Sequence, residues 1–143
     1  MEELTEGPTG RPFMQIGEVA AMTNLSLRTI RHYEELGLVV PSGRTSGGFR
    51  LYAEADVDRL RLVRRMKPFF SLEETKELLD VLEAVSFVGD EPLAERRELL
   101  DRVQMYRESV LVQREALQEQ VRQATAFAAE LKEIVAQREP LSR

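Results

Sequence analysis

The sequence has no cysteine, no tryptophan and a single histidine among its 143 residues. Without thiols, a protein cannot form structural disulfides, thiolate metal sites, iron–sulfur clusters or thiol redox switches. One histidine also argues against a zinc site built only from protein ligands. We therefore expect no bound metal and no cofactor.

Long apolar runs are also missing, and no stretch approaches the 18 apolar residues of a membrane span. The first twelve residues, MEELTEGPTGRP, are acidic where a secretion signal would begin with basic residues. They also lack a periodic apolar face, so residues 1–12 are predicted to be a disordered tail. We expect a cytoplasmic protein with no membrane partner.

The formal charge of −5 is spread unevenly along the chain. Residues 1–10 carry three acids and no base, and residues 68–143 carry sixteen acids against ten bases. Residues 11–67 carry ten Arg or Lys against six Asp or Glu, a local excess of positive charge. A surface that faces nucleic-acid phosphates needs such a local excess whatever the overall charge.

Two short helices are predicted at the start of this basic segment. Apolar spacing places the first between Ile16 and Thr23, followed by Asn24, a residue that tolerates the left-handed conformation. Ser26 is a good N-cap for a second helix that runs to about Leu36. Two helices joined by so tight a turn are typical of a helix-turn-helix.

The second helix has one apolar and one basic face. Leu27 and Ile30 are expected to point inward. The opposite face carries residues at i, i+3, i+4 and i+7, namely Arg28, Arg31, His32 and Glu35. Such a helix suits a DNA major groove, because arginine bonds guanine edges or phosphates. An ordinary solvated face is the alternative, and the basic surroundings favour DNA.

The next 50 residues predict a hairpin and two more helices. Segment 38–41, followed by segment 44–52, indicates two short strands around a Gly-rich turn, a hairpin the size of a basic wing. Residues 53–67 predict a third helix with a buried apolar stripe, made of Val57, Leu60, Val63 and Met66. Residues 71–74, Ser-Leu-Glu-Glu, form a capping box that starts a fourth helix, which carries Leu78, Leu79 and Leu82.

A long helix ends the chain. Residues 84–91 lack a helical stripe and contain Gly89, so they are predicted to be a hinge. Residues 92–138 are predicted to be a coiled-coil dimerisation helix, because apolar residues recur at 4-3 spacing with one stutter near Gln113 and Arg114. The predicted seam comprises Val103, Tyr106, Val110, Leu117, Val121, Ala124, Ala128, Leu131 and Val135. The expected fold is mainly α, a winged helix-turn-helix followed by this dimerisation helix.

Four motifs, MQIGEVA, LSLRTIRHYEELGL, GFRLY and FSLEE, resemble the MerR family of winged-helix regulators in order and spacing. The resemblance spans residues 13–83, the expected DNA-binding domain. It implies a homodimer joined by an antiparallel coiled coil and bound to an inverted repeat in promoter DNA. It also implies that the bound spacer is bent and untwisted, so that RNA polymerase engages both promoter elements.

The resemblance also implies the DNA contacts. They comprise Ser26, Arg28, Thr29, Arg31, His32 and Tyr33 on the recognition helix, and Arg44, Arg50 and Tyr52 in or beside the wing. The sequence departs from the family pattern at His32 and Phe49, where tyrosine is more usual. Residues 67–70, KPFF, also differ from the commoner Leu-Gly-Phe type, which affects the junction between the third and fourth helices.

The effector is left open by the sequence. Metal- and redox-sensing members of the family use cysteines after the dimer helix, and this chain has none. Multidrug-sensing members add a ligand domain, and only residues 139–143 follow the predicted helix. A sensor in the hinge and coiled coil, a partner protein, or no ligand remain. Four aromatic residues are a candidate pocket lining or, alternatively, packing between head and helix: Phe69, Phe70, Phe87 and Tyr106.

Three classes of function are consistent with these patterns. A dimeric transcription factor accounts for the helix-turn-helix, the wing, the charge distribution and the long helix together. An architectural or repressor-type DNA binder would share the same N-terminal half, whereas a coiled-coil adaptor leaves the outward arginines unexplained. An enzyme fits worst, because there is no nucleophile–base pair, phosphate loop or metal cluster.

Overall fold

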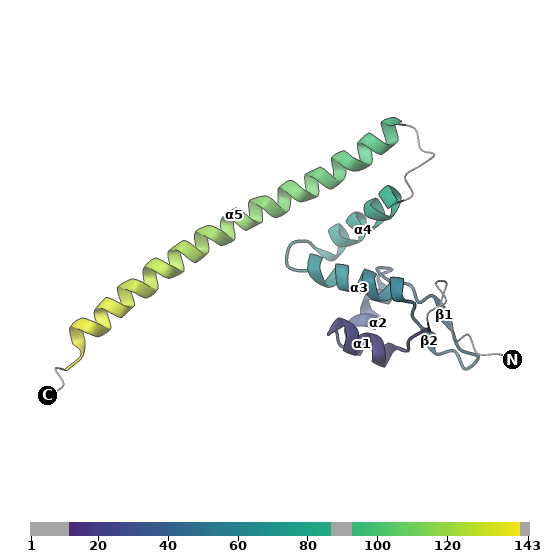
Figure 1. Cartoon of the computed structure of the whole chain (residues 1–143), viewed down its shortest axis with the longest axis horizontal. Coiled ribbons are helices and arrows are strands. Elements are labelled where there is room, and N and C mark those ends of the chain that lie inside the picture. Colours follow the sequence, from purple (N-terminus) through teal and green to yellow (C-terminus); the bar gives the residue numbers. More distant parts are fainter. Residues whose placement is uncertain (1–11, 87–92, 141–143) are drawn as a thin grey trace. The chain divides into compact units, whose positions relative to one another are not determined.

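The computed structural model describes residues 12–86 and 93–140, so nearly all of the predicted tail lies outside it. The chain divides into two compact units, residues 1–87 and 88–143. We call residues 12–86 the head and the single long helix of the second unit, α5 (Leu93–Arg138), the rod. Figure 1 shows four helices and a small hairpin in the head, and one uninterrupted helix in the rod. The predicted mainly α fold, with an N-terminal helix-turn-helix, a small wing and a long C-terminal helix, is confirmed.

Helices α1 (Ile16–Thr23) and α2 (Leu27–Glu35) form the predicted helix-turn-helix. Between them Asn24 has φ 56° and ψ 34°, the left-handed conformation that asparagine tolerates better than most residues. The Ser26 hydroxyl caps α2 by accepting a hydrogen bond of 3.0 Å from the Thr29 amide. Both ends of the turn are therefore fixed by local backbone chemistry.

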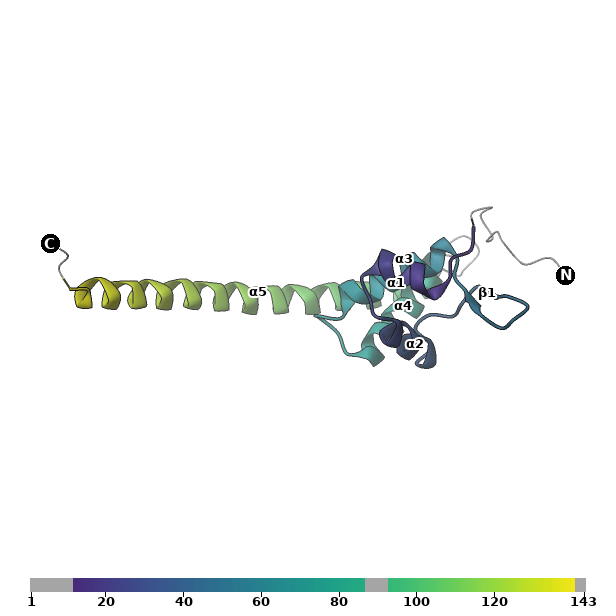
Figure 2. The same ribbon diagram turned by 90° about the horizontal axis from the view of Figure 1, so that it is seen from below.

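The wing is a hairpin of two very short strands, β1 (Gly43–Arg44) and β2 (Arg50–Leu51). They pair antiparallel, with Gly43 opposite Leu51 and Arg44 opposite Arg50. Its turn contains Gly48 at φ +83°, a backbone conformation that suits glycine. Figure 2 shows the hairpin loop reaching away from the helices of the head.

The predicted first strand at 38–41 is wrong. Leu38 and Val39 are each 1% exposed, and the Leu38 carbonyl accepts a hydrogen bond from Arg59 Nε rather than from a neighbouring strand. Burial of two successive side chains does not fit a two-sided hairpin, in which alternate residues face opposite sides. Leu38 and Val39 instead belong to the core, Val40 is 69% exposed, and strand pairing within the hairpin begins only at Gly43.

Helices α3 (Glu54–Met66) and α4 (Leu72–Ser86) complete the head. The capping box of α4 is present as predicted, with the Glu74 amide 3.1 Å from Ser71 Oγ and the Ser71 amide 3.1 Å from Glu74 Oε1. The buried apolar residues come from every helix of the head and from the segments around the wing: Val19, Ile30, Tyr33, Leu38, Val39, Leu51, Tyr52, Ala53, Val57, Leu60, Val63, Met66, Leu78, Leu79 and Val81.

One prediction for α4 needs correction. The predicted hinge starts too early, because α4 continues through residues 84–86 without a break. Of its apolar residues, Leu78, Leu79 and Val81 are buried and Leu82 is half-buried. The lack of a clear apolar stripe over residues 84–86 did not stop a helix that was already nucleated from propagating. The rest of the hinge lies outside the described residues.

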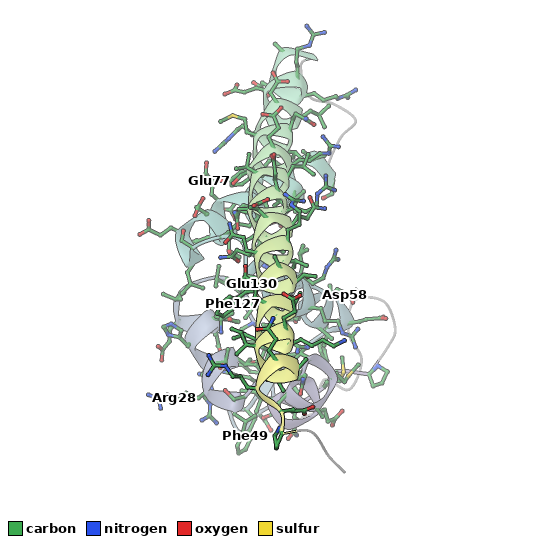
Figure 3. The ribbon with its side chains drawn as sticks, turned by 90° about the vertical axis from the view of Figure 1, so that its left-hand side faces the viewer. Arg28, Phe49, Asp58, Glu77, Phe127 and Glu130 are labelled. Atoms are coloured by element: carbon green, nitrogen blue, oxygen red, sulfur yellow. The ribbon has the colours of Figure 1, made fainter. Side chains whose placement is uncertain are left out.

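The rod is a 46-residue helix whose apolar side chains are largely open to solvent within this chain. Leu117 is 52% exposed, Val121 65% and Leu131 47%. Figure 3 shows side chains radiating from the whole length of α5, among them Phe127 and Glu130. Of the predicted seam, Val103, Tyr106 and Val110 are half-buried, and Leu117, Val121, Ala124, Ala128, Leu131 and Val135 are exposed.

Candidate nucleic-acid interface

Helix α2 presents a basic face because its apolar side chains point the other way. Ile30 is fully buried, and Tyr33 is 2% exposed. The opposite face lines a shallow hollow formed by Arg28, Thr29, Arg31, His32 and Glu35. The spacing of these residues over two turns places them on one side of the helix, as the sequence predicts. In Figure 3 the side chain of Arg28 reaches out from the head into solvent.

Ser26 and Thr29 make a polar edge at the N-terminus of α2. Their hydroxyl oxygens are 2.7 Å apart, and the Ser26 hydroxyl is also occupied by the Thr29 amide at 3.0 Å. A capped helix N-terminus with exposed hydroxyls favours negatively charged groups, because the helix dipole is positive there. This edge is suited to contacts with a phosphate backbone.

The wing adds two arginines and an exposed aromatic ring. Arg44 donates a hydrogen bond of 3.2 Å to the Gly48 carbonyl within the hairpin, which steadies the turn. Arg50 lies 2.6 Å from a carboxylate oxygen of Glu34, and this ion pair raises the pKa of the Arg50 guanidinium above its ordinary value. Phe49, beside the turn, is 69% exposed.

A second group of arginines projects from α3 beside the end of α1. Arg61 and Arg64 donate hydrogen bonds of 3.3 Å to the carbonyls of Met22 and Thr23, respectively. Cations at the C-terminus of a helix satisfy its last carbonyls and complement its dipole. With Arg65 they line a second hollow on the head. Sequence reasoning missed this group, although the spacing of its arginines along a predicted helix was available as a signal.

Residues 14–82 match the family described as MerR HTH family regulatory protein. These residues include the helix-turn-helix, the wing, α3 and most of α4. This half of the chain belongs to the MerR family. The match stops before the rod, so it concerns only the part that contains the helix-turn-helix and the wing.

Two curated HTH-type transcriptional regulators are similar to about half of this chain. The HTH-type transcriptional regulator ZntR of Escherichia coli K12 is 44% identical over 68 residues, which cover 47% of this chain and 48% of ZntR. The HTH-type transcriptional regulator HmrR of Sinorhizobium medicae is 43% identical over 67 residues, 46% of either protein. The chain thus matches about half the length of these relatives.

A solved MerR-family structure extends the similarity through the rod. HiNmlR, described as a MerR family regulator lacking the sensor domain and bound to promoter DNA, is similar with a TM-score of 0.58. The identity is 21%, and the superposition covers 84% of this chain and 93% of HiNmlR. At this identity the similarity concerns the fold alone.

The expected DNA contacts do not all lie on the surface. Ser26, Arg28, Arg31, His32 and Arg44 are exposed, and Thr29 and Arg50 are half-buried. Tyr33 and Tyr52, in contrast, are 2% and 0% exposed. The two rings pack into the core, and burial raises the pKa of the Tyr52 phenol to about 12. Their expected role as direct contacts is therefore corrected, because a buried ring has no surface to offer DNA.

Leu27 is a second correction on the recognition helix. It was expected to point inward with Ile30, yet it is 40% exposed. Leu27 is the first residue of α2, where the helix has only begun to approach the core. Ile30, the next apolar residue on this face of the helix, is fully buried.

The aromatic residues of the candidate ligand pocket fall in different parts of the chain. Phe69 and Phe70 follow α3 and are half-buried in the head, whereas Tyr106 belongs to the rod. Phe87 lies outside the described residues. The pocket stays a prediction.

Among residues 12–86 and 93–140, no group of three or more His, Asp or Glu side chains is placed to hold a metal ion. Within the same ranges, no helix combines the length and apolar character that crossing a membrane requires.

Proposed function

We propose that this MerR-family chain is a homodimeric, sequence-specific DNA-binding regulator that acts at promoters by distorting the spacer between the polymerase elements. The observation that carries the proposal is the outward basic face of α2 next to a wing with two further arginines. One arginine-bearing helix fits a major groove, and a basic hairpin beside it fits the flanking backbone. A protein that acts on promoter DNA would be located in the cytoplasm.

The proposed DNA contacts are the surface members of the predicted set: Ser26, Arg28, Thr29, Arg31, His32, Arg44 and Arg50. Arg28 and Arg31 are assigned to base edges or phosphates, and Ser26 and Thr29 to the backbone at the start of the helix. We assign DNA binding to residues 13–83 and dimerisation to residues 92–138. Tyr33 and Tyr52 are assigned to the core that supports these contacts.

Dimerisation is supported by the rod. Its apolar seam, including Leu117, Val121 and Leu131, is about half exposed or more in a single chain. The rod of a second copy would bury this surface, and burial of apolar surface is the main driving force for helix association. We propose an antiparallel pair of rods, as the family resemblance implies, so that two heads read the two halves of an inverted repeat.

Selection of bound duplexes from a random library by the purified chain tests the proposal. The expected result is an inverted repeat, whose two halves reflect the two heads of a dimer. Arg31→Ala should then weaken binding to the selected duplex by about 1–3 kcal/mol if it reads a base, or lower affinity evenly across sequences if it holds a phosphate. Affinities measured by fluorescence anisotropy at several salt concentrations distinguish a base contact from a phosphate contact.

Arg122→Ala is the matched control. Arg122 is an exposed arginine of the rod, 2.6 Å from Glu119, so its loss removes the same charge away from the proposed surface. Equal effects of the two substitutions, or a chain that selects no sequence, would count against the proposal.

A ligand-independent architectural or repressor-type DNA binder is the alternative function. It shares every feature of the head, so only the effect on transcription separates it from a spacer-distorting activator. In a purified transcription reaction with bacterial RNA polymerase, an activator should increase output from a promoter with a lengthened spacer. A repressor or architectural protein should lower the output or leave it unchanged.

A further inference from the structure

Glu34, on α2, contacts the wing through both of its carboxylate oxygens. Oε2 lies 2.6 Å from Arg50 Nε in an ion pair and accepts a hydrogen bond of 3.5 Å from the Tyr52 hydroxyl. Oε1 lies 3.8 Å from Arg44 Nη2. The Glu34 side chain is only 14% exposed, so these interactions are partly shielded from water and salt.

The hairpin needs such a partner. Arg44 and Arg50 are directly opposite each other on β1 and β2, and like charges in that position destabilise a strand pair. Two strands of two residues each are also too short to be stable alone. A carboxylate that contacts both arginines compensates the repulsion and connects the hairpin to the recognition helix.

The position of Glu34 is unexpected from charge alone. An acidic side chain within a surface that faces phosphates repels DNA, so its removal should by itself strengthen binding. Glu35, the next residue, is an acid on the exposed face of α2 beside Arg28 and Arg31. The two glutamates are therefore adjacent in sequence, yet only Glu34 bridges the helix to both wing arginines.

We propose that Glu34 is a positioning residue of the DNA-binding surface, which holds Arg44 and Arg50 so that the wing and α2 meet DNA in one fixed arrangement. This inference rests on the proposed function. In this arrangement the wing is oriented before DNA arrives, and binding does not have to order it. The gain in binding free energy from the two oriented arginines then exceeds the loss from repulsion between Glu34 and the phosphates.

The test compares Glu34→Gln with Glu35→Gln in the full chain. Both substitutions remove one negative charge from neighbouring positions on α2. With the duplex selected by the unsubstituted protein, Glu34→Gln should lower affinity about tenfold, comparable to losing one arginine contact. Glu35→Gln should raise affinity, because it removes only a repulsion between an acidic side chain and the phosphates. Equal gains for both variants would overturn the proposal.

A second variant shows whether Glu34 acts through Arg50. In an Arg50→Met background, Glu34→Gln should cost less affinity than it does alone, because the shorter of its two ion pairs is already broken. Fully additive losses would contradict action through Arg50. Where Glu34→Gln alone folds poorly, the mobility of the wing in Arg50→Met replaces it as the measurement, since that variant breaks the same pair from the wing side.

A readout without DNA separates this inference from the proposed function. Backbone relaxation of the Gly47 and Gly48 amides, measured by NMR, should show a more mobile wing tip in Glu34→Gln than in Glu35→Gln. An unchanged wing would overturn the positioning role even if DNA binds. If the unsubstituted chain binds no duplex, the proposed function is overturned. If the wing of Glu34→Gln is nevertheless more mobile than that of Glu35→Gln, Glu34 remains the residue that orients the hairpin.

Discussion

The head and the rod use the same apolar residue types in opposite ways. In the head, Val19, Ile30 and Leu60 are completely buried by residues of their own chain. In the rod, Val121 and Ile134 are more than half exposed. The head encloses a core by itself, whereas one straight helix cannot bury its own stripe. The difference supports the proposal that the rod pairs with a second helix.

The largest expected effect comes from placing charge on the seam of the rod. Leu117→Glu with Leu131→Glu should prevent dimerisation, because a paired seam would then bury uncompensated carboxylates. Analytical ultracentrifugation should show a monomer, and binding to an inverted repeat should be lost. The melting transition of the head should persist, since no head residue is changed.

The matched control for that pair is Ala126→Glu with Gln137→Glu. These positions are exposed and lie on the opposite side of α5 from Leu117 and Leu131. The same added charge should leave the dimer intact. A dimer that survives the seam substitutions, or dissociates equally in the control, would refute the assignment of the seam.

A core substitution in the head should have the next largest effect. Leu60→Ala should lower the free energy of unfolding by about 2–5 kcal/mol, because Leu60 is 0% exposed and its removal leaves a cavity. Urea denaturation should show this loss independently of protein concentration. Leu72→Ala, at a position 39% exposed, is the control and should have a much smaller effect.

Alkaline pH should weaken the head selectively. Burial raises the pKa of Tyr52 to about 12, so the phenol loses its proton more easily in the unfolded chain, where its pKa is about 10. The stability that this neutral phenol contributes is complete below pH 10 and should fall by an amount on the order of 2 kcal/mol as pH rises towards 12. Urea denaturation between pH 9 and 11 measures the free energy of unfolding, which should fall less steeply with pH in Tyr52→Phe than in the unsubstituted protein.

The smallest expected effect concerns the start of α4. Ser71→Ala removes the hydroxyl that accepts a hydrogen bond from the Glu74 amide, and should lower the stability of the head by about 1 kcal/mol. Ser46→Ala, at an exposed position in the wing turn, should have no measurable effect. A loss of equal size in both variants would exclude a capping role for Ser71.

Much of the helical fold could be predicted because its signals are local. Asn24, Ser26 and the Ser71–Glu74 box each act on the backbone within a few residues, so they mark helix ends in the sequence itself. The stripe of α3 is likewise visible in the sequence, because 3.6-residue periodicity and burial coincide there. These predictions needed no knowledge of the tertiary fold.

The wing and its surroundings were predicted less well because their structure depends on distant partners. Leu38 and Val39 looked like a strand, but the core encloses them and Arg59 binds the Leu38 carbonyl from 21 residues away. Tyr33 and Tyr52 lie in motifs that resemble DNA contacts, yet packing buries both rings. Side-chain type and spacing do not reveal which of two faces the core will cover.

The helices, the caps of α2 and α4, the basic face of α2 and the long apolar repeat of the rod are all visible in the sequence. They follow from interactions between residues a few positions apart. The contacts of Glu34 with the arginines of the wing, and the burial of the two tyrosines beneath that surface, depend on the folded head. Residues 10 to 18 positions apart meet there, and the folded core alone brings them together.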